Sequence, residues 1–229
     1  MLRIGGFTPL STTDWPGMLS AVVFCQGCPW RCRYCHNPAL IPVHGEDEVG
    51  WPSVLAFLRR RRGLLDAVVF SGGEPTLQGE LREAICEVRE MGFQIGLHSA
   101  GMYPERLAAL LPLLDWVGLD VKAACADYAR ITGVPGSGEH AFASLDLLLG
   151  SGVPYEIRTT VHPALLDDVA ASALAHELAS LGVRHYAMQA FRSQGCADVA
   201  LNRSVIRARP LTSTGHDIAQ QFEDFAVRN

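Results

Sequence analysis

The stretch "CQGCPWRCRYCHN", residues 25–37, is the most informative part of the chain, because it places four cysteines within eleven residues. Cys28, Cys32 and Cys35 have the spacing C-x3-C-x2-C, and Cys25 precedes them. Thiolates are soft ligands that suit iron–sulfur clusters or zinc. A zinc ribbon separates its two cysteine pairs by about 15–20 residues, which disfavours structural zinc here. Three thiolates at this spacing can hold a cubane cluster and leave its fourth iron open to a substrate. A closed four-cysteine electron-transfer cluster is the alternative.

The bulk composition predicts a globular protein of 229 residues with a formal net charge of −5. We expect residues 1–229 to form a single domain, with a core of about 18–195 and a tail of about 204–229. The acidic balance argues against nucleic-acid binding. The start "MLRIGGFTPL" does not resemble a signal peptide, and no apolar stretch is long enough to cross a bilayer. These features predict a cytoplasmic protein without a membrane partner, where clustered cysteines bind metal more often than they form disulfides.

Six apolar, β-rich runs alternate with amphipathic helical patterns along the chain. The runs are residues 20–24, 66–70, 93–97, 116–120, 155–161 and 185–189. This alternation predicts an α/β fold with a parallel sheet and right-handed crossovers. Six strands are too few for a closed eight-unit barrel, so we expect an open partial (β/α)6 barrel, or else an open wound sheet. We expect the tail to end in a helix through "DIAQQFEDFAV" (217–227).

Polar or glycine-rich segments follow the predicted strands. They are the cysteine loop, "SGGEPT" (71–76), "HSAG" (98–101), "LDVK" (119–122), and "QAFRSQG" (189–195). The fifth strand carries Arg158. Because the carboxyl ends of parallel strands meet at one edge of a sheet, these segments predict one composite site.

The cysteine motif, with Tyr34 before its last cysteine and "HN" after it, resembles the radical S-adenosylmethionine (radical SAM) superfamily. The wider segment "GGFTPLSTTDWPGMLSAVVFCQGCPWRCRYCHNP" (5–38) resembles the activating enzymes of glycyl-radical enzymes. Among these it is most similar to the anaerobic ribonucleoside-triphosphate reductase activating proteins. The similarity runs from about Ile4 to about Gln194, and it implies the open partial barrel of the radical SAM type.

This resemblance implies an oxidoreductase in which Cys28, Cys32 and Cys35 ligate a [4Fe–4S] cluster and S-adenosylmethionine binds the open iron. The reduced cluster would cleave S-adenosylmethionine to methionine and a 5′-deoxyadenosyl radical, and the radical would take a hydrogen atom from a glycine of a partner glycyl-radical enzyme. A flavodoxin or ferredoxin-type protein is the expected reductant. The protein would bind and orient the cofactor, whose own chemistry makes the radical.

The resemblance also assigns cofactor contacts to residues of the predicted loops: Tyr34, Gly72, Gly73, Glu74, His98, Ser99, Asp120, Lys122 and Arg158. The two glycines let the backbone approach a ligand closely, and Glu74 accepts from the ammonium of S-adenosylmethionine. Asp120 and Lys122 contact its ribose and carboxylate, with a rim salt bridge as the alternative. Arg158 faces the cofactor or forms a buried ion pair.

Two positions depart from the family pattern. Relatives often have threonine at the position of Cys25, and we interpret this thiol as a strand-end residue that points away from the cluster. Pyruvate formate-lyase activating enzymes read Asp-Thr-Asn-Gly where this chain has "HSAG" (98–101). A monovalent-cation site built on that aspartate is therefore in doubt, although His98 can donate to a ribose hydroxyl.

Two alternatives to a glycyl-radical partner remain. The substrate could be a small molecule, as in the compact relative 7-carboxy-7-deazaguanine synthase, or the chain could be a non-catalytic metal-binding module. The run "RRRR" (59–62) is either a solvated helix end or a docking surface for an acidic electron donor.

Overall fold

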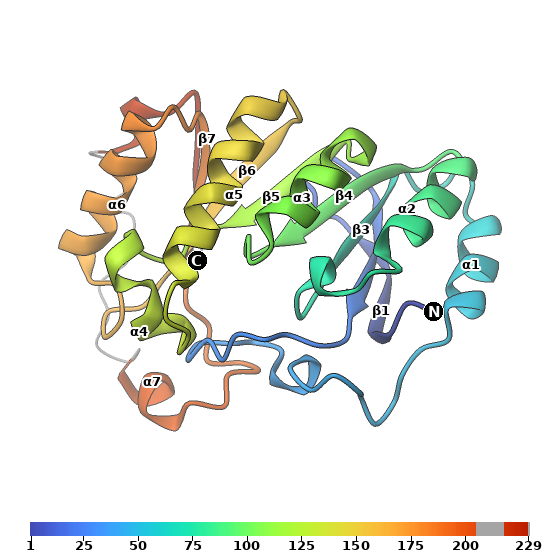
Figure 1. Ribbon diagram of the computed structural model, residues 1–229, viewed down its shortest axis with the longest axis horizontal. Coiled ribbons are helices and arrows are strands. Elements are labelled where there is room, and N and C mark those ends of the chain that lie inside the picture. Colours follow the sequence, from blue (N-terminus) through green and yellow to red (C-terminus); the bar gives the residue numbers. More distant parts are fainter. Residues whose placement is uncertain (205–217, 229) are drawn as a thin grey trace.

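The computed structural model describes residues 1–204 and 218–228, and its centre is one eight-stranded sheet in the order β1 to β8 (Figure 1). Six strands match the predicted runs, and each is parallel to its neighbours in this set. They are β2 (Ser20–Cys25), β3 (Ala67–Gly72), β4 (Gln94–Ser99), β5 (Trp116–Asp120), β6 (Tyr155–Val161) and β7 (His185–Ala190). The sheet is open, which confirms the predicted α/β partial barrel.

Two further strands, which the sequence pattern did not predict, form the edges of the sheet. β1 (Ile4–Ser11) pairs antiparallel with β2, and β8 (Asp224–Arg228) pairs parallel with β7. The predicted C-terminal helix is therefore wrong for residues 224–227, which belong to β8, whereas Ala219–Gln221 do form one short 3-10 turn, and Asp217 lies outside the described residues. In β8, Phe225 and Val227 pack against the core in the alternating pattern of a strand. That packing outweighs the helical pattern of the segment.

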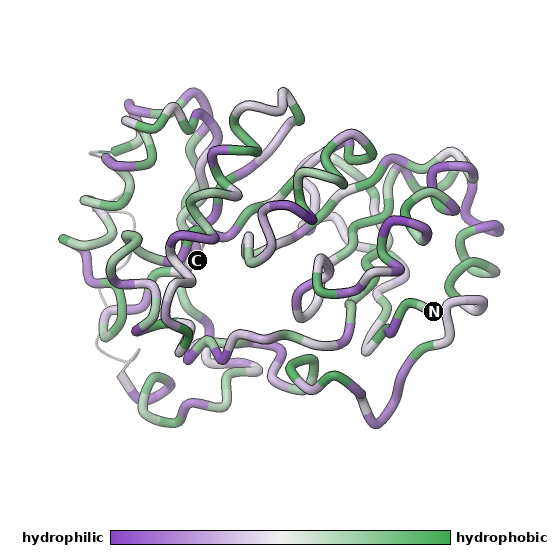
Figure 2. The backbone as a smooth tube through the Cα atoms, viewed as in Figure 1, coloured by the Kyte–Doolittle hydropathy of each residue, from purple (hydrophilic) through white to green (hydrophobic). Residues whose placement is uncertain are grey.

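Five helices connect successive parallel strands and follow the same order across the sheet, from α1 to α6 in Figure 1. They are α1 (Trp51–Arg59), α2 (Leu81–Glu90), α3 (Pro104–Leu110), α5 (Ser137–Ser151) and α6 (Asp168–Ser180). Each buries an apolar stripe against the sheet. In Figure 2 the central strands are mostly green, whereas purple residues gather in the loops and on the outer turns of the helices.

Two short helices, α4 (Tyr128–Thr132) and α7 (Val199–Ser204), lie beside the cysteine loop rather than along the sheet (Figure 1). A separate small apolar cluster includes Trp15, which stacks on Trp116 with ring centroids 5.4 Å apart. Trp15 belongs to the connection between β1 and β2, so this connection packs against the sheet. No helix in the described ranges is long and apolar enough to cross a membrane.

The strand register brings the predicted functional loops to one edge of the sheet. Cys25, the last residue of β2, pairs with Gly72 at the end of β3. Asp120, the last residue of β5, pairs with Arg158 of β6. The loops that leave these strands therefore start side by side, as the rule for parallel sheets requires.

Candidate functional site

The cysteine loop begins where β2 ends, and it divides its four thiols into two groups. Cys25 is fully buried in the main apolar core. Cys28, Cys32 and Cys35 are half-buried and line a cavity of about 420 Å³. The structure thus places three thiols at the cavity, and it places Cys25 in the core behind the loop.

The three cavity thiols fit a cluster better than a single metal ion. Among the described residues, no three His, Cys, Asp or Glu side chains converge closely enough to hold one ion. In a [4Fe–4S] cluster each thiolate binds a different iron, so convergence on one point is not required. Burial raises the pKa of Cys28 to about 12 and also raises the pKa of Cys32. Without a metal, Cys28 and Cys32 are therefore protonated at neutral pH, and ligation must displace their protons.

Most of the other residues predicted from the sequence lie around the same cavity. They are Tyr34, Gly72, Gly73, His98, Ser99, Asp120, Lys122 and Arg158. The cavity is also lined by Ser71, Gln189 and Arg192, which lie in predicted segments but were given no role, and by Asp14 and Thr160, which the sequence-based prediction did not assign to the site. Thr160 is the register partner of Gln189 near the ends of β6 and β7, so the strand-end rule could have identified Thr160 as well. Asp14 precedes β2 and carries no such signal.

The two glycines after β3 allow direct contact between two loops. A Cβ on Gly73 would lie 2.3 Å from the Gly27 carbonyl oxygen, and one on Gly72 would lie 2.4 Å from the Cys25 nitrogen. Gly73 N–H donates to the Cys25 carbonyl at 2.9 Å, and Glu74 N–H donates to the Gly27 carbonyl at 2.9 Å. Side chains are excluded here by the cysteine loop itself. The glycines therefore fix the loop after β3 against the loop that carries the thiols.

Glu74 is the one predicted residue whose side chain does not line the cavity, because it is fully buried. Its Oε1 accepts hydrogen bonds from the N–H of Thr76 at 3.1 Å, the Thr76 hydroxyl at 2.6 Å and the Ser99 hydroxyl at 2.9 Å. Its Oε2 accepts from Ala100 N–H at 2.9 Å. Burial raises the pKa of Glu74, and these donors oppose that effect. The carboxylate thus joins the loops that follow β3 and β4.

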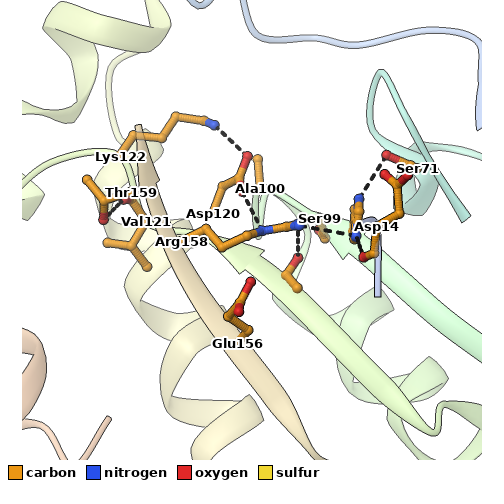
Figure 3. A network of polar contacts seen from close by, with 12 residues as sticks. Asp14, Ser71, Ser99, Ala100, Asp120, Val121, Lys122, Glu156, Arg158 and Thr159 are labelled. Atoms are coloured by element: carbon orange, nitrogen blue, oxygen red, sulfur yellow. Dashed lines mark hydrogen bonds and ion pairs between the residues drawn. The ribbon is translucent and has the colours of Figure 1, made fainter. Parts of the chain in front are cut away.

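Three charged side chains meet on one wall of the cavity (Figure 3). Lys122 Nζ lies 3.2 Å from Asp120 Oδ2, and Arg158 Nε lies 3.4 Å from Asp120 Oδ1. Burial alone would raise the pKa of Asp120, but the two cations outweigh it and hold the pKa below its usual value. The Lys122 ammonium also lies 5.7 Å from the centre of the Tyr34 ring. The wall therefore carries two positive charges against one negative charge and suits a ligand with a carboxylate.

His98 lies beside this wall as a neutral imidazole. Burial and the neighbouring Arg158 guanidinium lower its pKa to about 3. Nε2 lies 2.7 Å from the Asp14 carbonyl oxygen and 3.2 Å from Arg158 Nη1, and Nδ1 lies 3.1 Å from the Ser71 hydroxyl oxygen. Both ring nitrogens have protein partners, so His98 links the connection before β2 to the end of β3.

Comparison with known proteins agrees with this arrangement. Residues 22–174 match the family model of the radical SAM superfamily. A Methanocaldococcus jannaschii protein named as a glycyl-radical enzyme activating enzyme is 31% identical over 209 residues, covering 85% of this chain and 82% of that protein. The pyruvate formate-lyase-activating enzyme of Clostridium pasteurianum is 35% identical over 173 residues, covering 73% of this chain and 71% of the enzyme.

A solved structure extends the comparison to the fold. Streptococcus suis SuiB bound to S-adenosylmethionine superposes with a TM-score of 0.65 over 89% of this chain, which spans 48% of SuiB, at 11% identity. At that identity the likeness concerns the fold alone. Radical SAM enzymes use a [4Fe–4S] cluster and S-adenosylmethionine, and the cavity combines three thiols with a charged wall. The chain belongs to the radical SAM superfamily and, within it, to the family of glycyl-radical-enzyme activating enzymes.

Proposed function

We propose that this protein activates a glycyl-radical enzyme by removing a hydrogen atom from one of its glycine Cα atoms, and that the partner is an anaerobic ribonucleoside-triphosphate reductase. The observation that carries the activase part is the single cavity that joins Cys28, Cys32 and Cys35 to the charged wall. Family membership supports the reaction class. The choice of partner rests on the resemblance of residues 5–38.

The cofactors and the protein have separate tasks in this proposal. When bound, the cluster supplies one electron to S-adenosylmethionine, which yields methionine and the 5′-deoxyadenosyl radical that accepts the glycine hydrogen. Cys28, Cys32 and Cys35 would hold the cluster. Lys122 and Arg158 would bind the carboxylate of S-adenosylmethionine, and the Asp120 carboxylate would accept from its ribose hydroxyls.

A second cavity favours a peptide over a small substrate. It has a volume of about 440 Å³ and shares five lining residues with the first cavity: His36, Asn37, Thr160, Gln189 and Arg192. Its amide and hydroxyl side chains can donate to and accept from a peptide main chain. A flat heterocycle would call for more apolar and aromatic walls than this cavity offers.

The surface around the cysteine loop suits an acidic electron donor of the flavodoxin or ferredoxin type. Arg31 is exposed, and its Nη1 donates to the Cys28 carbonyl at 2.7 Å. The run Arg59–Arg62 is less suitable, because it precedes β3 and therefore lies at the edge of the sheet opposite to the thiols. A donor docked beside Arg31 would deliver its electron next to a cluster ligand.

The test is to mix the anaerobically reconstituted protein with S-adenosylmethionine, dithionite and purified anaerobic ribonucleotide reductase. We expect a glycine-centred EPR doublet, and deuterium should move from Cα-deuterated glycine into 5′-deoxyadenosine. A doublet that forms only with pyruvate formate-lyase would support the proposed activase reaction and would replace the proposed partner by pyruvate formate-lyase. Cleavage of S-adenosylmethionine without a radical on any glycyl-radical enzyme would contradict the proposal and favour a small substrate.

A further inference from the structure

The cysteine loop is held by the segment that follows β7, residues 191–204, which we name the closing segment, and one residue from each side of this contact, His36 and Arg192, also lines the cavity. The two are more than 150 residues apart in sequence, and in Figure 1 the closing segment with α7 lies beside the cysteine loop. None of the contacts described below involves a cavity thiol. They therefore act on the shape of the loop rather than on the metal ligands.

The first contact fixes the end of the loop at His36. Its ring stacks on Phe191 with centroids 5.5 Å apart, and its Nε2 lies 2.9 Å from the Arg192 carbonyl oxygen. Gly195, at φ +84°, packs so closely that a Cβ there would lie 2.3 Å from the His36 carbonyl oxygen. Only glycine satisfies both the backbone conformation and this approach.

The second contact is an ion pair that Asp198 of the closing segment makes with Arg33 of the loop. Arg33, which lies between Cys32 and Cys35 in sequence, donates through Nε at 3.2 Å and Nη2 at 3.0 Å to Asp198 Oδ2. Asp198 Oδ1 accepts from the N–H groups of Ala200 and Leu201 at the start of α7. One carboxylate therefore orders the closing segment and binds the loop.

The opposite side of the loop is bound to the end of α4. Arg31 N–H donates to the Thr132 carbonyl at 2.9 Å, and Arg33 N–H donates to the Ile131 carbonyl at 3.1 Å. The backbone around Arg33 is thus held on one side by main-chain bonds and on the other by a side-chain ion pair. On the side of the closing segment, Cys196 Sγ also donates to the Arg33 carbonyl oxygen at 3.5 Å, so loss of the ion pair leaves the bend between Cys32 and Cys35 with only weaker support on that side.

We infer that Asp198 and Gly195 are positioning residues that keep the cysteine loop in its cluster-binding shape and slow the loss of the cluster. The inference rests on the proposed role of Cys28, Cys32 and Cys35 as cluster ligands. It assigns no chemistry to the closing segment, because the contacts reach the loop backbone, His36 and Arg33 only. Its measurable consequence is the rate at which the bound cluster is lost.

The experiment compares reconstituted wild type with Asp198→Asn and Gly195→Ala by following iron release to a ferrous chelator under anaerobic conditions. Asparagine keeps the helix cap and removes the charge, so it isolates the ion pair. We expect iron release about three- to five-fold faster in Asp198→Asn and at least ten-fold faster in Gly195→Ala. The EPR spectrum of the reduced cluster should broaden in both variants.

Two comparisons make the result specific. Glu223→Gln removes another exposed ion pair, Arg184 Nη1 to Glu223 Oε1 at 2.7 Å, and should leave iron release unchanged. Arg33→Gln combined with Asp198→Asn should release iron no faster than either change alone, since both remove the same contact. Wild-type release rates in Asp198→Asn and Gly195→Ala would overturn this inference alone. A wild-type protein that takes up no cluster would overturn the proposed function and this inference together.

Discussion

The Ser99 hydroxyl donates to Glu74 Oε1 at 2.9 Å, and this hydrogen bond joins the loops that follow β3 and β4. Both residues were predicted to contact the cofactor, yet their side chains contact each other. The Ser99 hydroxyl also accepts from Gly101 N–H at 3.0 Å, so Ser99 links Glu74 to the backbone of the loop that follows β4. The wall of the cavity therefore depends on a carboxylate that lies behind it.

Glu74→Gln should destabilise the protein and weaken binding of S-adenosylmethionine. A glutamine amide would turn N–H donors toward groups that themselves donate, which leaves at least one buried donor unpaired. We expect a loss of about 1–3 kcal/mol in the free energy of unfolding. The KM for S-adenosylmethionine should rise several-fold, as measured by 5′-deoxyadenosine formation. Glu83→Gln, an exposed change on α2, is the matched control. An unchanged KM in Glu74→Gln would show that the link between the loops is dispensable.

His98→Gln should remove part of the acid sensitivity of folding. The folded pKa of about 3 lies below the ordinary value of 6.5, so below pH 6.5 the unfolded state binds more protons than the folded state. The free energy of unfolding then falls as the pH falls from 6.5 toward 3, by up to about 1.4 kcal/mol per pH unit. The free energy of unfolding, measured with denaturant at pH 7.0, 6.0 and 5.0, should fall less steeply with decreasing pH in His98→Gln than in wild type. His140→Gln, an exposed change, should keep the wild-type dependence on pH, and an equal dependence in all three proteins would refute a neutral His98.

Arg228→Met should weaken the attachment of β8. Arg228 donates through Nη1 at 2.8 Å and Nη2 at 2.6 Å to the two carboxylate oxygens of Glu156, which is nearly buried. Loss of the cation leaves that carboxylate without its partner. Because Arg228 is about one third exposed, we expect a cost of about 1–3 kcal/mol in urea unfolding rather than the full cost of a buried pair.

The matching change in an exposed pair gives the reference for this result. Arg184→Met breaks the contact with Glu223, where both side chains are exposed, and should cost less than about 1 kcal/mol. The double change of Glu156→Leu with Arg228→Met should recover part of the stability lost in Arg228→Met. Equal costs for the two single arginine changes would mean that the Glu156 pair behaves as an ordinary surface contact.

Six strands could be predicted because each is an apolar run bounded by polar or glycine-rich segments. β8 could not be predicted, because an alternation of Phe225 and Val227 within only five residues is too short a signal. These residues form a strand because they pair with β7 and pack against the core. The strand-end rule correctly brought the thiols, Asp120 and Arg158 to one edge of the sheet.

The details of the site depend on contacts that sequence spacing does not encode. Spacing suggests that Gly73 approaches a ligand, whereas the structure packs it on the Gly27 carbonyl. Likewise, spacing cannot show that Asp14 meets His98, because the two lie 84 residues apart, Asp14 in the connection between β1 and β2 and His98 in β4.

The central claim is that three thiols, and not four, serve one cluster. Reductive cleavage of S-adenosylmethionine tests it most directly, with wild type, Cys25→Ala and Cys28→Ala each reconstituted anaerobically, reduced with dithionite and assayed for 5′-deoxyadenosine. Cys25 lies in the core and Cys28 lines the cavity. We predict that wild type and Cys25→Ala form 5′-deoxyadenosine and that Cys28→Ala does not. A folded Cys25→Ala protein that binds no cluster, or a Cys28→Ala protein with wild-type activity, would contradict the account.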